Sequence, residues 1–293
     1  HGSAGIKLAY SMAEQSFIKG GINRVILATD GDFNVGTVNH EALVNLVEKN
    51  KSKGISLTTL GFGHGNYNDA LMEQLADHGD GNYAYIDNLS EARKTLVQQI
   101  AATLETIAKD VKIQIEWNPQ LVSEYRLVGY QNRILNREDF NNDKVDAGEI
   151  GAGHTVTALY EITMTNNQTT RIDPLRYQVQ KTKNMNSSST GSSELAFLKL
   201  RYKKTDETKS RLIQQAITQH DMNENPQHVS NSLQFAASVA AFGDLLRGGV
   251  NVNQFDYEGV LNLARKGRGE DLHGYRGEFI RLVELSAELD SNS

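Results

Sequence analysis

The sequence predicts an α/β domain, then a β-rich, sandwich-like domain and a carboxyl-terminal helical segment. Up to about residue 108, short apolar runs alternate with stretches of helical periodicity, which is typical of a parallel sheet covered by helices. Strict apolar and polar alternation then replaces this pattern, and helical periodicity returns near residue 223. We therefore expect domains at 1–108, 109–222 and 223–293, and the chain of 293 residues is long enough to hold them.

The first domain is expected to begin with a helix and then to alternate strands with helices. The apolar run Val25–Ala28 lacks polar alternation, so it predicts a strand buried on both faces. Asn88 and Glu91 form a capping box that opens a last helix, whose apolar stripe continues to Ile107. The other helices are predicted at 2–17, 41–51 and around 71–75, and the other strands at 55–60 and 82–86.

The later domains follow from two further patterns. Alternation over Val111–Trp117 is typical of an antiparallel strand with one wet face. From Pro226 onward three helices are expected, separated by stop signals at Gly248–Gly249 and at Gly267. Further strands are predicted at 121–130, 154–165, 194–203 and 210–218.

Composition excludes several classes of function. The net charge is −6 and the basic residues are scattered, so there is no footprint for nucleic acid or for an anionic membrane. No run approaches the roughly 20 apolar residues of a membrane-spanning helix. The absence of cysteine excludes disulfides, thiol nucleophiles and thiolate metal sites.

The loop that follows the first strand is the strongest candidate for a metal site. In open α/β sheets, ligands and ions bind at the carboxyl ends of the strands. Asp30 and Asp32 stand at such an end, and carboxylates are the ligands that a hard divalent cation prefers. The alternative is a surface turn, in which Asp32 and Asn34 are turn-forming residues.

Three motifs in this region resemble the second half of a von Willebrand factor type A domain of the bacterial kind. They are Thr29-Asp30-Gly31, then Gly61-Phe62-Gly63 with Tyr67, then Gly81–Ile86. The rest of the chain is similar to the carboxyl-terminal domain of the YfbK-like bacterial proteins. That similarity rests on Glu124–Leu127, Asp146–His154 and Gly274–Arg276.

The resemblance implies a metal-ion-dependent adhesion site that is incomplete here. In the family, three loops hold the ion, and only Asp30 of Thr-Asp-Gly has its counterpart, since Asp-x-Ser-x-Ser is absent. We expect the chain to lack the first part of the domain. Mg²⁺ or Mn²⁺ is then expected in the intact protein, with Asp32 acting through water, but not bound tightly by this chain. Asn34, Tyr67 and Asn68 are expected to contact a protein partner on the same rim.

The same resemblance makes Val25–Ala28 an open edge, because the missing first strand would pair with it. A long apolar edge recruits another strand or aggregates. We expect this edge to be covered by another chain or fragment.

A second acidic stretch contains Asp139, Asn141, Asn142, Asp143, Asp146 and Glu149. Counted from Asp139, Lys144 stands where a calcium loop requires glycine and Ile150 where it requires glutamate. A hairpin turn with Asx caps is the favoured interpretation, and a calcium site of another geometry stays open. His64 and His78 lack the spacing of a zinc motif.

These observations favour a non-enzymatic protein-interaction or adhesion module at the cell surface or in the periplasm. One alternative is a scaffold or chaperone-like subunit that works beside an ATPase, as some bacterial type A proteins do by resemblance. The other is a metal-assisted hydrolase that uses Asp30, Asp32 and a histidine. It lacks a general base at recognisable spacing.

Overall fold

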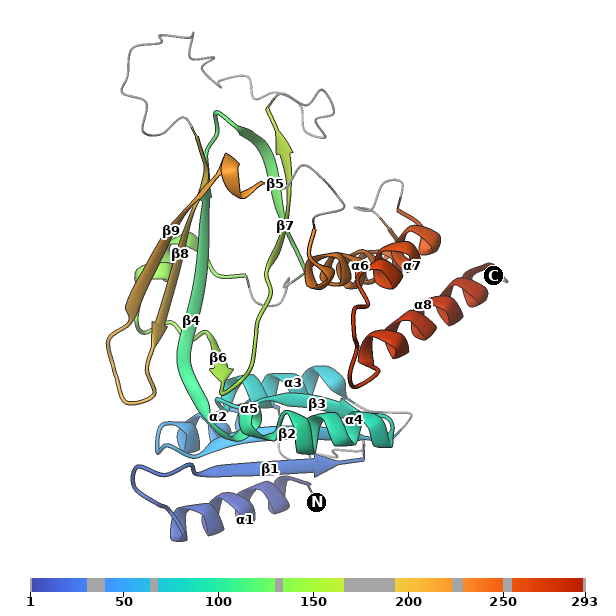
Figure 1. Cartoon of the computed structure of the whole chain (residues 1–293). Helices are drawn as coiled ribbons and strands as arrows, with labels where there is room; N and C mark the ends of the chain where they lie inside the picture. Colours follow the sequence, from blue (N-terminus) through green and yellow to red (C-terminus); the bar gives the residue numbers. More distant parts are fainter. Residues whose placement is uncertain are drawn as a thin grey trace, which may run out of the picture. The chain divides into compact units, whose positions relative to one another are not determined.

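The computed structural model describes residues 2–30, 40–63, 68–129, 134–165, 193–222, 229–249 and 255–291 (Figure 1). These residues form two compact units, neither of which is continuous in sequence. Unit 1 comprises 1–114, 136–156 and 200–213, and unit 2 comprises 115–135, 157–199 and 214–293. The three predicted domain ranges stay a prediction.

Unit 1 contains a three-stranded parallel sheet in the order β1-β2-β3. Its strands are β1 (Arg24–Thr29), β2 (Ser56–Phe62) and β3 (Tyr83–Ile86). The central strand β2 is buried from Leu57 to Gly61, because strands and helices surround it on all sides. The predicted α/β class is confirmed.

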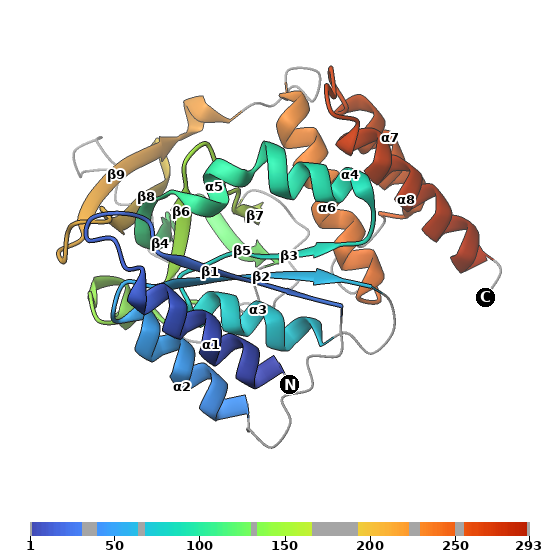
Figure 2. The same ribbon diagram turned by 90° about the horizontal axis from the view of Figure 1, so that it is seen from below.

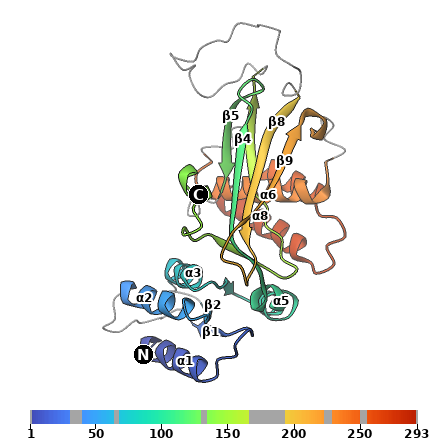
Figure 3. The ribbon, with the colours of Figure 1, turned by 90° about the vertical axis from the view of Figure 1, so that its left-hand side faces the viewer.

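Helices cover both faces of this sheet. On one face, α1 (Gly2–Gln15), α2 (His40–Lys51) and α3 (Asp69–His78) share one apolar core with β1 and β2. On the other face lie α4 (Leu89–Arg93) and α5 (Ile100–Leu104), as Figures 2 and 3 show. The core consists of Ile6, Tyr10, Val25, Leu43, Val47, Ile55, Leu57, Leu71 and Leu75.

The prediction that the last helix continues to Ile107 is wrong, because α5 ends at Leu104. A π-helical turn over Lys94–Gln98 interrupts the predicted helix, and strand β4 (Thr106–Trp117) already includes Ile107, which is 49% exposed. The reason is a pairing that the apolar stripe does not reveal. Thr106 pairs with Gly151, and the Ala152 amide donates to the Glu105 carbonyl oxygen at 2.8 Å, so the chain is extended from here on.

Strand β4 belongs to a four-stranded sheet in the order β6-β4-β8-β9, whose strands β4, β8 and β9 contribute residues to both units. A second, antiparallel pair joins β5 (Val122–Val128) to β7 (Leu159–Met164). The predicted β-rich part is thus confirmed. Besides β4, the four-stranded sheet consists of β6 (Gly148–Gly151), β8 (Glu194–Lys203) and β9 (Arg211–Thr218).

The hairpin turn expected in the acidic stretch is replaced by other structure. Residues Arg137–Asn141 form a 3₁₀ helix, and Phe140 at its centre is buried. Strand β6 then pairs antiparallel with β4, which is distant in sequence. The Asx turn of the prediction is nevertheless present, because the Lys144 amide donates to Asn142 Oδ1 at 3.0 Å, but it connects the 3₁₀ helix to β6 and does not close a local hairpin.

The three predicted carboxyl-terminal helices are present in unit 2. They are α6 (Asn231–Leu246), α7 (Tyr257–Lys266) and α8 (Tyr275–Ser291). Phe242, Val260 and Val283 form their shared core. Gly267 ends α7, and a Cβ there would lie 2.5 Å from the Phe235 amide nitrogen, so the close approach to α6 requires glycine. Among the described helices, none has the length and hydropathy needed to cross a bilayer.

Candidate functional site

The carboxyl-end rim of the parallel sheet is formed by Asp30 after β1 and Gly63 after β2. Asp30 is exposed. Gly63 has φ +91°, and a Cβ there would lie 2.8 Å from the Asp30 carbonyl oxygen. Tyr85 lies in β3, and its hydroxyl group donates a hydrogen bond to the Gly63 carbonyl oxygen. The rim is therefore closely packed in its backbone, and its exposed carboxylates among the described residues include Asp30 and Asp87, which follows β3.

The other predicted rim residues are only partly described. Asp32, Asn34 and Tyr67 lie outside the described residues. Asn68 is the N-cap of α3, and its Oδ1 accepts a hydrogen bond from the Leu71 amide at 3.1 Å. Capping is thus one role of Asn68, and contact with a partner stays a prediction.

The metal prediction was tested against the donor set around Asp30. Within the described part of the chain, the one group of three potential metal-ligating side chains does not include Asp30. A single carboxylate does not meet the six or more oxygen ligands that Mg²⁺ or Ca²⁺ takes. The described residues therefore do not fit a divalent ion at this rim.

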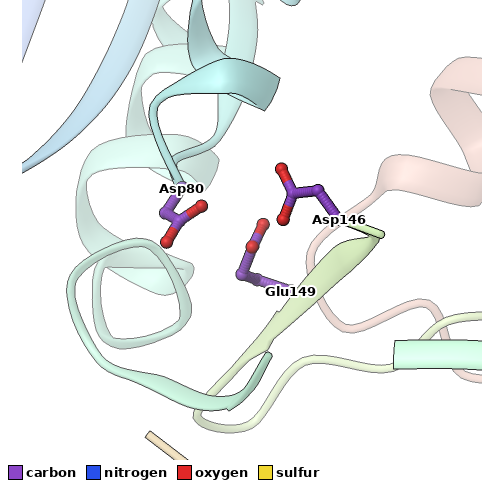
Figure 4. A group of neighbouring side chains, drawn as sticks. All are labelled: Asp80, Asp146 and Glu149. Carbon is purple, nitrogen blue, oxygen red and sulfur yellow. The ribbon is translucent and has the colours of Figure 1, made fainter. Parts of the chain in front are cut away.

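The amino-end edge of the same sheet holds that group of three, Asp80, Asp146 and Glu149 (Figure 4). Asp80 lies in the turn between α3 and β3, Asp146 precedes β6 and Glu149 lies in β6. One oxygen atom from each carboxyl group lies within 4.8 Å of the others, and Figure 4 shows the three side chains converging. We call these three residues the carboxyl cluster.

Two glycines fix the position of Asp80. Asp80 itself has φ +50°, a left-handed conformation that Asp tolerates better than most residues. A Cβ on Gly81 would lie 1.7 Å from the Leu57 carbonyl oxygen, and one on Gly79 would lie 2.7 Å from the Leu57 Cβ. The turn therefore packs directly on β2, which holds the Asp80 carboxyl group at one place.

Lysine side chains neutralise part of the carboxyl cluster. Lys51, the last residue of α2, places its Nζ 2.5 Å from Asp80 Oδ1 and 2.7 Å from Asp146 Oδ2. Lys109 Nζ lies 3.9 Å from Asp80 Oδ2. Because a protein cation already bridges two of the three carboxylates, the cluster is an internal ion-pair network rather than a free metal cage.

The environment shifts the pKa of three members of this network. Burial raises the pKa of Asp146, although its hydrogen bond with Lys51 acts in the opposite direction. Burial raises the pKa of Glu149 to about 8, and the neighbouring charges of Asp80 and Asp146 act in the same direction. Burial alone would lower the pKa of Lys51, but its hydrogen bonds with Asp146 and Asp80 raise it overall. Glu149 therefore keeps its proton at neutral pH, while Lys51 stays charged.

The remaining acidic stretch is tied to cationic side chains. Lys112 Nζ donates to the Asn142 carbonyl oxygen at 2.6 Å, and Lys203 Nζ donates to the Asp143 carbonyl oxygen at 2.7 Å. Arg201 Nη1 donates to Asn141 Oδ1 at 2.7 Å. Hydrogen bonding from Ser210 lowers the pKa of Asp143. Lysine and arginine thus already bond oxygen atoms of this stretch, and the calcium site of another geometry stays a prediction.

Sequence reasoning missed the carboxyl cluster as a unit. The sequence places Asp146 and Glu149 in an acidic stretch and in a motif of the YfbK-like resemblance, and it gives no reason to join them to Asp80. The signal that pointed to Asp80 was the triplet Gly79-Asp80-Gly81, which is typical of a tight turn with a left-handed residue.

Comparisons with known proteins agree with the predicted YfbK-like resemblance. A family model described as "Uncharacterized protein YfbK, C-terminal" matches residues 102–289. "Uncharacterized protein YfbK" of Escherichia coli (strain K12) is 46% identical over 286 residues, which are 98% of this chain and 48% of that protein. The chain thus spans about half the length of this relative.

A solved structure, "von Willebrand factor type A from Catenulispora acidiphila", aligns with a TM-score of 0.37 and 14% identity. The alignment covers 89% of this chain and 60% of the chain in that structure. This likeness adds nothing to the argument about the site. The family model, in contrast, matches more than half of the chain, so the chain belongs to the family described as YfbK, C-terminal.

Proposed function

We propose that this chain is a protein-interaction module that recognises its partner at the carboxyl-end rim. The observation that supports this most directly is Asp30, an exposed carboxylate on a rim whose backbone is fixed by Gly63 and Tyr85. A rigid backbone beneath an exposed polar side chain is what a recognition surface needs, because little order is lost on binding. The module acts by binding and not by catalysis.

We propose that a metal ion binds at this rim only in the longer protein. Asp30 supplies one carboxylate, and the other ligands for Mg²⁺ or Mn²⁺ come from residues beyond those that the structure describes. Asp32, Asn34, Tyr67 and Asn68 are the proposed neighbours of the site. The proposed location is the periplasm or the cell surface.

Metal titration calorimetry on the full-length protein and on this chain tests the shared site. We expect Mn²⁺ to bind the full-length protein and to bind this chain much more weakly. Asp30→Ala in the full-length protein should abolish binding. Asp87→Ala is the matched control, because Asp87 is likewise an exposed residue that follows a strand of the same sheet, and it should leave binding unchanged. Equal binding by both chain lengths would refute the proposal.

A separate measurement addresses catalysis. Full-length protein is incubated with a generic phosphate ester and a carboxylic ester in the presence of Mn²⁺. We expect no turnover. Turnover that disappears with Asp30→Ala would instead support the metal-assisted hydrolase.

The edge strand supplies a second test of partner binding. Ile26 in β1 is 47% exposed, and among the described strands β1 pairs only with β2. We propose that another chain or fragment covers Val25–Ala28. Hydrogen exchange of the β1 amides that point away from β2 should be fast in this chain and slow in the full-length protein. Equally fast exchange in both proteins would contradict the proposal.

A further inference from the structure

We propose that Glu149 carries a proton that latches β6 onto the amino-end edge of the parallel sheet, and that losing this proton releases β6. The latch consists of the carboxyl cluster together with Lys51. It lies in unit 1 and is independent of the proposed function at the opposite rim.

The spacing of the carboxyl groups is the first argument. Lys51 forms ion pairs with Asp80 and Asp146. If Glu149 were ionised as well, three negative charges would lie with oxygen atoms within 4.8 Å of one another. Like charges this close in a partly buried site disfavour ionisation of all three. A protonated Glu149 instead donates a hydrogen bond to Asp80, which converts a repulsion into an attraction.

Charged groups from α2, β1 and β4 surround the cluster, and Asp110 of β4 shares a hydrogen bond with Asp146. Lys51 from α2, Arg24 from β1 and Lys109 from β4 favour the ionised form of the cluster. Burial of Glu149, the charges of Asp80 and Asp146, and the hydrogen bond to Asp80 favour the protonated form. The second set prevails, since the pKa of Glu149 is raised to about 8.

The pairing of β6 with β4 is short and irregular, so the Glu149 proton affects how firmly β6 is attached. β6 has four residues, and its pairing with β4 shifts register between Thr106 and Ala108 and again between Ala108 and Val111. Asp110 at the second shift has φ +50° and accepts a hydrogen bond from the Ala147 amide at 3.3 Å. Backbone contacts hold the Gly151 end of β6, where the Ala152 amide donates to the Glu105 carbonyl oxygen at 2.8 Å. Toward Gly148 the ladder is irregular, so the side-chain network helps to hold that end of the strand.

The sign of the pH dependence follows from the raised pKa. Below the usual glutamate pKa of about 4.3, Glu149 is protonated whether β6 is attached or free. Between that value and about 8, only the attached form keeps the proton, so attachment weakens as pH rises through this window. Above it the carboxyl group is ionised in both forms, and the full repulsion opposes attachment.

Carbon-13 NMR of the Glu149 side-chain carboxyl group is the direct test. We expect its titration midpoint near pH 8. In parallel, hydrogen exchange corrected for the intrinsic rate should show the protection of the β6 amides falling by about tenfold or more between pH 6.5 and pH 9, because one pKa unit is tenfold in population. Glu149→Gln, which keeps a neutral donor, should retain protection at pH 9. Glu116→Gln, at an exposed glutamate of β4, should behave like the wild type.

Three results would overturn the proposal. One is a midpoint near the ordinary glutamate value. Another is a midpoint near 8 with unchanged protection of β6. The third is a titration midpoint that falls when Ca²⁺ or Mg²⁺ is added, while the β6 amides stay protected at pH 7. That result would make the carboxyl cluster a metal site. If Glu149→Gln fails to fold, the two wild-type measurements still decide between these outcomes.

Discussion

The two edges of the parallel sheet in unit 1 differ in how completely their polar groups are paired. At the carboxyl-end rim, Asp30 is exposed and lies outside the one potential metal-ligating group among the described residues. At the amino-end edge, Lys51 joins Asp80 to Asp146 beside Glu149. The difference is that Asp30 at the rim is exposed, whereas the charged groups of the amino-end edge form ion pairs within unit 1.

The largest expected effect is at the amino-end edge, from Gly81→Ala. The new Cβ would lie 1.7 Å from the Leu57 carbonyl oxygen, so the turn that carries Asp80 must move away from β2. We expect a loss of more than about 3 kcal/mol in the free energy of unfolding, measured by urea denaturation. Gly5→Ala in α1, where no atom lies within 4 Å of the added carbon, is the control and should stabilise by up to about 1 kcal/mol. A mild effect of Gly81→Ala would show that this edge is not rigid.

Lys51→Met removes the cation between Asp80 and Asp146. The two carboxylates are then left without their nearest positive charge in a partly buried site, so we expect about 2 kcal/mol of destabilisation at pH 7. The control is Lys53→Met, because Lys53 pairs with Glu14 on the open surface and should contribute less than about 0.5 kcal/mol. Equal effects of the two substitutions would erase the contrast between the edges.

Gly63→Ala probes the rigidity of the rim. Residue 63 has φ +91°, and the added carbon would press on the Asp30 carbonyl oxygen at 2.8 Å. We expect a loss of about 1 to 2 kcal/mol in the free energy of unfolding, since both strain and contact oppose the change. Gly20→Ala, at φ +75° with open space around it, separates the two causes because it carries the strain alone. The same loss in both variants would mean that the rim is not tightly packed.

Asp30→Ala should have the smallest effect on stability. Asp30 is exposed, so we expect a change within about 0.5 kcal/mol in this chain. The predicted cost of this substitution lies in metal and partner binding by the full-length protein. A destabilisation above about 1 kcal/mol would show that Asp30 has a structural role and would make the two edges alike.

Local periodicity was sufficient to predict most elements. The apolar spacing in α2, α6, α7 and α8 and the alternation in β8 depend on neighbours in the sequence, which the chain shows directly. The end of the helix before Ile107 was missed because β6 draws residue 106 into a strand from more than forty residues away. That pairing has no local signature.

The two edges also differ in how well sequence could reveal them. Asp30 stands in a contiguous motif after a strand, so the motif was enough to single it out. The carboxyl cluster assembles residues 80, 146 and 149 with Lys51, and only the folded chain brings these positions together. The raised pKa of Glu149 depends on burial and on these neighbours, and the adjacent residues in the sequence predict neither.

The discontinuity of unit 1 limits where the chain can be divided into fragments. Residues 1–114 are complemented by 136–156 and 200–213, and the segment 136–156 supplies Asp146 and Glu149 to the cluster that Asp80 begins. A break at the predicted boundary near residue 108 would leave Lys51 and Asp80 on one fragment and Asp146 and Glu149 on the other. Neither fragment would hold the complete carboxyl cluster, so a fragment that ends near residue 108 should lose the ion pair between Lys51 and Asp146.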